Sequence, residues 1–171
     1  MPSNWGFPSF LNGEDLATGL QNRAEKIATT VFLKDIKAQL FIITGSGGAQ
    51  KDLFAAYLTL QLYRRSTGKT RPRYIYTPAI ETVRPIVGYE EDDTTGHFTV
   101  FGAADQIDKR YSRAVLARIF SILSNGNVVI LSVKSMDSLY AKYGQDFVQT
   151  YEKITRVIEL STVNEIVLEA I

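Results

Sequence analysis

The residues with the clearest chemical potential form a glycine-rich segment that follows an apolar run. It reads GSGGAQKD and comprises Gly45, Ser46, Gly47, Gly48, Ala49, Gln50, Lys51 and Asp52. The spacing is close to G-x-x-x-x-G-K-[ST], a loop whose backbone N–H groups surround phosphate oxygens. In that loop the lysine reaches the β- and γ-phosphates, and the final hydroxyl holds Mg²⁺. The segment therefore indicates a site for the phosphates of ATP together with Mg²⁺.

Two residues of this segment depart from the motif. Gln50 replaces the second glycine and carries a Cβ where the loop bends close to phosphate, so a strained backbone angle is expected. Asp52 replaces the hydroxyl residue, and its carboxylate repels a polyphosphate although it can coordinate Mg²⁺ directly. An acidic residue also suits a helix start, where the dipole favours negative charge. Weak nucleotide binding and a purely structural helix start both remain open.

Hydrolysis of ATP would need a second strand that ends in two acidic residues. The Asp orients Mg²⁺ through water, and the Glu activates the attacking water. The candidate strand lies within HFTVFGAADQID, residues 97–108. If this strand ends at Phe101, the two positions hold Gly102 and Ala103, and both acidic groups are missing.

A longer strand gives a different assignment. If it ends at Ala104, Asp105 takes the Asp position and Gln106 takes the Glu position. A glutamine can orient water but cannot accept its proton, so the general base is in doubt in both assignments. If the protein is active, Asp105 and Gln106 are the candidate catalytic residues. Asp52 and Asp105 are then the candidate Mg²⁺ ligands.

The composition narrows the other function classes. The chain has 171 residues, 45% of them hydrophobic and 22% charged, which is typical of one soluble globular domain. It has no Cys, which excludes disulfides, thiolate catalysis and Cys-based zinc sites, and its one His leaves little for other metal sites. The net charge is only +1, so the protein has no strong overall positive potential that would attract nucleic acid. No apolar run reaches the roughly 18 residues of a membrane span, and the first ten residues lack a secretory signal, so we expect a cytoplasmic protein.

The hydrophobic periodicity predicts alternating helices and strands. We expect strands at residues 38–44, 73–77, 97–105 and 127–133, and two more within 155–171 around an STVN turn. We expect helices at residues 14–33, 51–65, 112–126 and 135–153, the last interrupted at Gly144. The alternation predicts an α/β three-layer sandwich, with a mostly parallel sheet flanked by helices. Residues 1–12 are expected to form an N-terminal arm, and residues 13–171 a single domain.

Three segments resemble the core of a known superfamily. Leu40–Asp52, the strand around Val100 and the strand Val128–Val133 are similar to the core elements of RecA/FtsK-type P-loop ATPases. The segment SMDSLYAKYG, which follows the third element, resembles the corresponding part of conjugative coupling ATPases and, less closely, of helicase loaders. In this superfamily the third strand ends in a polar sensor residue. The candidates for that sensor are Ser132, Lys134 and Ser135.

The resemblance implies a RecA-like P-loop NTPase fold with degenerate nucleotide motifs, because Gln50 and Asp52 depart from the superfamily pattern. It also implies terminal antiparallel strands, formed by TRVIEL and NEIVLEAI. Proteins of this kind act in oligomers, so the expected partners are related ATPase-like subunits in a homo- or hetero-oligomer.

A basic segment offers a different kind of surface. YRRSTGKTRPRYIY, residues 63–76, places cations between tyrosines, a combination that binds phosphates and stacks on bases. Its cations are Arg64, Arg65, Lys69, Arg71 and Arg73. The alternative is an exposed helix end, where cations interact favourably with the helix dipole.

These features support three hypotheses. The first is a catalytically degenerate ATPase-like subunit that serves as a scaffold or regulator in an oligomeric machine for DNA handling or secretion. The second is a divergent, active ATPase that binds ATP–Mg²⁺ through Lys51. The third is a nucleic-acid-binding module that uses residues 63–76.

Overall fold

The computed structural model describes residues 16–33, 38–46, 50–66, 71–79 and 97–160 of the chain. Two of the sequence expectations therefore lie outside the described residues. These are the N-terminal arm at residues 1–12 and the last predicted strand, NEIVLEAI.

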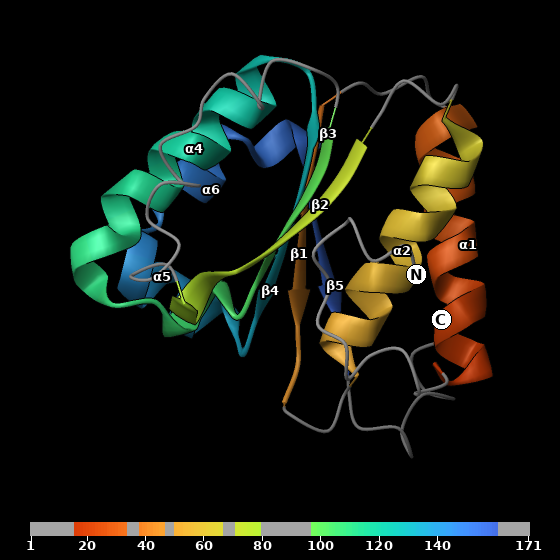
Figure 1. Ribbon diagram of the computed structural model, residues 1–171, viewed down its shortest axis with the longest axis horizontal. Helices are drawn as coiled ribbons and strands as arrows, with labels where there is room; N and C mark the ends of the chain where they lie inside the picture. Colours follow the sequence, from red (N-terminus) through yellow and green to blue (C-terminus); the bar gives the residue numbers. More distant parts are fainter. Residues whose placement is uncertain (1–15, 34–37, 47–49, 67–70, 80–96, 161–171) are drawn as a thin grey trace.

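One parallel sheet organises the described chain (Figure 1). Its strands are β1 (Gln39–Thr44), β2 (Arg71–Tyr76), β3 (His97–Gly102), β4 (Val128–Val133) and β5 (Thr155–Glu159). Their order is β2-β3-β4-β1-β5, and every neighbouring pair runs parallel. The predicted parallel sheet is confirmed. All five carboxyl ends therefore lie along one edge of the sheet, where ligands bind in open α/β folds.

Helices cover both faces of this sheet, which confirms the predicted three-layer arrangement (Figure 1). The α-helices are α1 (Thr18–Leu33), α2 (Lys51–Arg65), α4 (Ser112–Ser124), α5 (Met136–Tyr143) and α6 (Asp146–Thr150). Short 3₁₀ helices are η4 (Thr77–Ala79), η6 (Ala104–Gln106), η7 (Lys109–Tyr111) and η8 (Glu152–Ile154). Helices α1 and α2 pack on one face, and α4, α5 and α6 pack on the other. Among the described helices, none is long and apolar enough to span a membrane.

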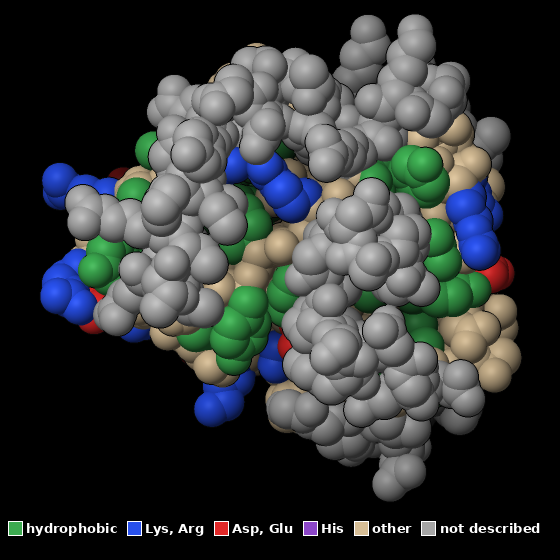
Figure 2. All heavy atoms as spheres, in the orientation of Figure 1, with side chains coloured by type: hydrophobic (Ala, Val, Ile, Leu, Met, Phe, Trp, Pro, Cys, Tyr) green, Lys and Arg blue, Asp and Glu red, His purple; other side chains and the backbone are tan. Residues whose placement is uncertain are grey.

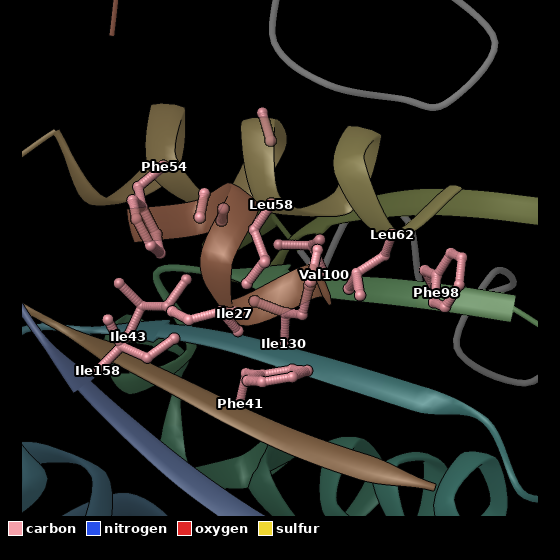
Figure 3. Packing of buried hydrophobic residues seen from close by; sticks show 14 of the residues in the cluster. Ile27, Phe41, Ile43, Phe54, Leu58, Leu62, Phe98, Val100, Ile130 and Ile158 are labelled. Atoms are coloured by element: carbon pink, nitrogen blue, oxygen red, sulfur yellow. The ribbon is translucent and has the colours of Figure 1, made fainter. Parts of the chain in front are cut away.

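The central strands are apolar throughout because both of their faces are buried. In β1, Phe41 and Ile43 point toward α1 and α2, while Leu40 and Ile42 belong to the core under α4 and α5. Figure 3 shows the first of these cores, where Phe54 of α2 lies close to the strand residues. This alternation follows from the two-residue repeat of a strand, and it explains the unbroken hydrophobic run before the glycines. The packing fixes the end of β1, and with it the start of the glycine-rich segment.

Two sequence expectations need correction. The segment TRVIEL was expected to run antiparallel, but β5 pairs with β1 in parallel, with Leu40 opposite Thr155. The reason is the helical segment between β4 and β5, which carries the chain back across the sheet before it re-enters beside β1. The strand expected at residues 97–105 ends at Gly102, because Ala103 adopts a left-handed conformation (φ 50°, ψ 45°) that leaves the sheet.

The break at Gly144 is confirmed, and it generates a prediction. Gly144 separates α5 from α6 with φ 83° and ψ 163°, a region that essentially only glycine populates. A Cβ at this position would meet no atom within 4 Å, so any penalty of Gly144→Ala comes from the backbone alone. We expect Gly144→Ala to lower the free energy of unfolding by about 1–3 kcal/mol, measured as a lower urea midpoint at unchanged slope.

The neighbouring variant Gln145→Ala is the matched control. Gln145 is exposed, and its side chain makes no capping hydrogen bond to α6. Its replacement is expected to change the stability by less than about 0.5 kcal/mol. Equal midpoints for the two variants would contradict the backbone argument.

Candidate nucleotide site

The glycine-rich segment connects the end of β1 to the start of α2, which is the predicted context for a phosphate loop (Figure 1). Gly45 is buried directly after β1, and Ser46 is exposed. The remaining loop residues, Gly47, Gly48 and Ala49, lie outside the described residues. Lys51 is the first residue of α2. It therefore lies at the end of the helix where the backbone N–H groups have no partner within the helix.

Lys51 folds back toward the strand that precedes it. Its Nζ donates a hydrogen bond to the carbonyl oxygen of Gly45 at 3.1 Å, and the side chain is half-buried. The acceptor is neutral, and an ammonium group has three donors. Within the part of the chain that the structure describes, Lys51 is therefore held beside Gly45 with no carboxylate at hydrogen-bond distance.

Gln50 adopts the left-handed conformation that the motif reserves for glycine. Its φ is 59° and its ψ is 30°, which confirms the strain expected at this position. For a residue with a Cβ this conformation costs roughly 1–2 kcal/mol. The side chain offsets part of that cost, because its Oε1 accepts a hydrogen bond from the Ala17 amide at 3.2 Å. Ala17 immediately precedes α1, so Gln50 links the loop to the start of that helix.

Asp52 is bonded to the central strand β4. Its Oδ1 accepts a hydrogen bond from the Ser132 hydroxyl at 2.9 Å, and Ser132 is fully buried. Ser132 lies opposite Ile43 of β1, one residue before the end of that strand. Of the three candidate sensor residues, Ser132 is therefore the one whose side chain is bonded to Asp52, the residue after Lys51. Asp52 does more than begin a helix, because it joins α2 to β4.

Tyr74 fills the space next to Gly102. The two residues lie on neighbouring strands, and a Cβ built on Gly102 would overlap the Tyr74 hydroxyl and lie 2.5 Å from its Cζ. Burial raises the pKa of Tyr74, and the negative charge of Asp52 raises it further. The hydroxyl therefore stays neutral and lies within electrostatic reach of Asp52. In the assignment that ends the strand early, Gly102 holds the position of the metal-orienting Asp.

Asp105 serves a different element. Its Oδ2 accepts hydrogen bonds from the Lys134 amide at 2.9 Å and from the Ser138 hydroxyl at 2.7 Å. Ser138 also forms a capping box with Ser135 at the start of α5. Asp105 is buried, and its two hydrogen bonds connect η6 to the residues at the beginning of α5. Gln106 is exposed.

The two candidate metal ligands are bonded to different residues at the end of β4. Asp52 accepts from Ser132, whereas Asp105 accepts from the Lys134 amide, which directly follows β4, and from Ser138 of α5. Within the described ranges, no group of three or more His, Asp or Glu side chains is placed to hold a metal ion. A metal role for Asp52 and Asp105 stays a prediction.

The basic segment lies at the other end of α2. This helix has 15 residues, so its last turn is roughly 20 Å from the phosphate loop. Arg64 and Arg65 are exposed there, and Arg73 is half-buried in β2. Lys69 and the side chain of Arg71 lie outside the described residues. On the face shown in Figure 2, the described Lys and Arg side chains form separate groups rather than one continuous patch.

Three contacts of this site have no signal in the sequence. They are the position of Tyr74 over Gly102, the bond from Ala17 to Gln50, and the bond from Ser132 to Asp52. Each joins residues more than 25 positions apart. Strand order and register, rather than a local motif, bring these residues together.

Comparisons with known proteins place the fold. No protein-family model matches the sequence, and no curated protein matches it. Among solved structures, the DnaC helicase loader is similar with a TM-score of 0.62 and 12% identity, over 94% of this chain and 99% of that one. A DNA replication initiation factor gives a TM-score of 0.63 and 12% identity, over 93% of this chain and 51% of that one.

A third similar structure was solved with ligands. The replication initiator DnaA bound to AMPPCP and single-stranded DNA has a TM-score of 0.62 and 12% identity, over 96% of this chain and 54% of that one. The chain has the P-loop NTPase fold. It spans about half the length of the initiation factor and of DnaA, and the low identities extend the likeness to the fold alone. The resemblance to conjugative coupling ATPases stays a prediction.

The strain at Gln50 can be measured with two substitutions. Both Gln50→Ala and Gln50→Gly remove the bond to the Ala17 amide, but only glycine adopts a φ of 59° without strain. We expect Gln50→Gly to be more stable than Gln50→Ala by about 1 kcal/mol in urea unfolding. Amide hydrogen exchange at Ala17 should be faster than in the wild type in both variants. Equal stability of the two variants would argue against a strained Gln50.

The close packing of Tyr74 against Gly102 predicts that substitutions at these two positions affect the stability in a non-additive way. Gly102→Ala should destabilise the protein by about 1–3 kcal/mol, because the added methyl group overlaps a buried ring. In a Tyr74→Ala background the same change should be close to neutral, since the overlapping atoms are gone. A double-mutant cycle by urea unfolding measures the difference. Additive effects of the two substitutions would contradict this packing.

Proposed function

We propose that this chain is a catalytically degenerate P-loop ATPase-like subunit that serves as a scaffold or regulator in an oligomeric machine for DNA handling. The proposal depends on one observation, which is the packing of Tyr74 against Gly102. A glycine stands at position 102, and Tyr74 occupies the space that a carboxylate side chain would need. Without that carboxylate, the site lacks the group that orients Mg²⁺ and the attacking water.

The residue after Gly102 supports the same conclusion. The observed β3 ends at Gly102, and the next residue, Ala103, has a methyl side chain that can neither accept nor orient a proton. The alternative assignment would use Asp105 and Gln106. The Oδ2 of Asp105, however, accepts two hydrogen bonds, from the Lys134 amide after β4 and from the Ser138 hydroxyl of α5, so this oxygen has a structural role. A divergent active ATPase is therefore the weaker of the two readings.

The link to DNA handling rests on likeness of fold and on surface charge. Structures with this fold include a helicase loader and a replication initiator bound to single-stranded DNA. Exposed Arg64 and Arg65 offer cations for phosphate contacts at the end of α2. Their distance from the phosphate loop, roughly 20 Å, separates a nucleic-acid contact from the nucleotide site.

The experiment that tests the proposal is steady-state ATP hydrolysis with Mg²⁺ by the wild type and by Lys51→Ala. We expect the two proteins to release phosphate at the same background rate, because the groups that activate water are missing. Lys142→Ala is the matched control, since Lys142 Nζ also donates to a backbone carbonyl, that of Ile107 at 2.7 Å, but belongs to α5. Hydrolysis that disappears in Lys51→Ala and persists in Lys142→Ala would overturn the proposal.

A further inference from the structure

The candidate site has a phosphate part and a metal part, and the described residues fit them differently. In the phosphate part, Lys51 and the start of α2 lie beside Gly45 at the carboxyl end of β1. Among the described residues, the hydrogen-bond partner of the Lys51 ammonium group is a neutral carbonyl oxygen, which a phosphate oxygen replaces at little electrostatic cost. This part of the site fits a phosphate group.

The metal part does not fit Mg²⁺. Mg²⁺ requires near-octahedral oxygen ligands at about 2.0–2.1 Å and is usually held through carboxylates and substrate phosphates. Position 102 has no carboxylate, and the Tyr74 ring fills the space that one would need. Tyr74 is 6% exposed, so the ring cannot swing into solvent without opening the core.

Asp52 is an acidic residue that directly follows Lys51, and it makes a structural contact. Its Oδ1 accepts the hydrogen bond from Ser132, and its charge acts on the neutral Tyr74 hydroxyl. Asp52 and Ser132 thus join α2 to β4, while the Tyr74 hydroxyl lies beside Gly102 of β3. A metal ion on Asp52 Oδ1 would have to compete with the Ser132 bond.

We propose that Lys51 and the start of α2 bind the phosphate groups of a nucleotide without a divalent metal ion. The Lys51 ammonium group and the N–H groups at the start of α2 neutralise the charge of the phosphates. The Asp52–Ser132 bond and the Tyr74 ring beside Gly102 occupy the part of the site where a metal ion would bind. This inference deepens the proposed function and rests on it, because the metal that hydrolysis needs is the group that the site no longer accommodates. Nucleotide then acts as a structural ligand of the subunit.

The charge of Asp52 distinguishes this arrangement from a metal site. If Asp52 held Mg²⁺, neutralising it would weaken the binding of ATP–Mg²⁺. If Asp52 is a structural group that faces a metal-free anion, neutralising it removes a repulsion and strengthens binding. Asp52→Asn keeps the size of the side chain and an oxygen that accepts from Ser132. The two cases therefore predict changes of opposite sign for one conservative substitution.

The test is isothermal titration of the full chain with ATP, once with excess EDTA and once with Mg²⁺, at matched ionic strength. We expect the two dissociation constants of the wild type to agree within about twofold, and Lys51→Ala to weaken both by about tenfold or more. Asp52→Asn should bind ATP in EDTA several-fold more tightly than the wild type. Lys142→Ala should bind like the wild type.

Several outcomes would overturn the inference. Binding that requires Mg²⁺ would do so, as would weaker binding by Asp52→Asn in the presence of Mg²⁺. Absence of ATP binding at millimolar concentration in both buffers would also overturn it, while leaving the proposal of a non-hydrolysing scaffold intact. Hydrolysis that depends on Lys51 would instead overturn the proposed function. The wild-type comparison needs no variant, so a substitution that impairs folding cannot remove the test.

Discussion

The parallel pairing of β1 with β4 on one side and β5 on the other is the constraint on which the rest of the structure depends. It buries the backbone of β1, so each of its N–H and C=O groups must find a partner in a neighbouring strand. It also brings the ends of β1, β3 and β4 to the same edge of the sheet. The glycine-rich segment and Ser132 meet at this edge only because those strands run in the same direction. The position of Asp52 relative to Ser132 follows from the pairing of β1 with β4, while Tyr74 and Gly102 are positioned by the pairing of β2 with β3.

At this edge, internal contacts hold the residues of the candidate site in place. Asp52 is bonded to Ser132, Lys51 to the Gly45 carbonyl and Gln50 to the start of α1. Such contacts stabilise the protein without a ligand, whereas unpaired polar groups in a preorganised ligand site cost stability until the ligand binds. The pattern suits a subunit whose phosphate loop holds elements together. The same hydrogen bonds connect Gln50 to the start of α1 and Asp52 to the central strand β4.

Backbone strain is concentrated in the same region. Among the described residues, the two non-glycine positions with positive φ are Gln50 and Ala103, which follow β1 and β3 respectively. Strained backbone persists where surrounding structure over-determines it, and it clusters at ligand sites. Gln50 is fixed by its bond to Ala17, and Ala103 lies between the strand and the buried turn of η6. Gln50, the residue before Lys51, thus has the left-handed backbone that glycine adopts most readily.

The sequence by itself determined the local elements and the location of the loop. The 3.6-residue periodicity gave α2 its observed bounds, and the apolar run before the glycines gave a strand buried on both faces. These signals are local, since hydrophobic spacing and glycine conformation act within a few residues. The direction of β5, the structural role of Asp105 and the position of Tyr74 over Gly102 were decided only by the tertiary structure. Each of these depends on which strands become neighbours and in what register, and no short segment encodes that choice, because it results from burying both faces of the whole sheet at once.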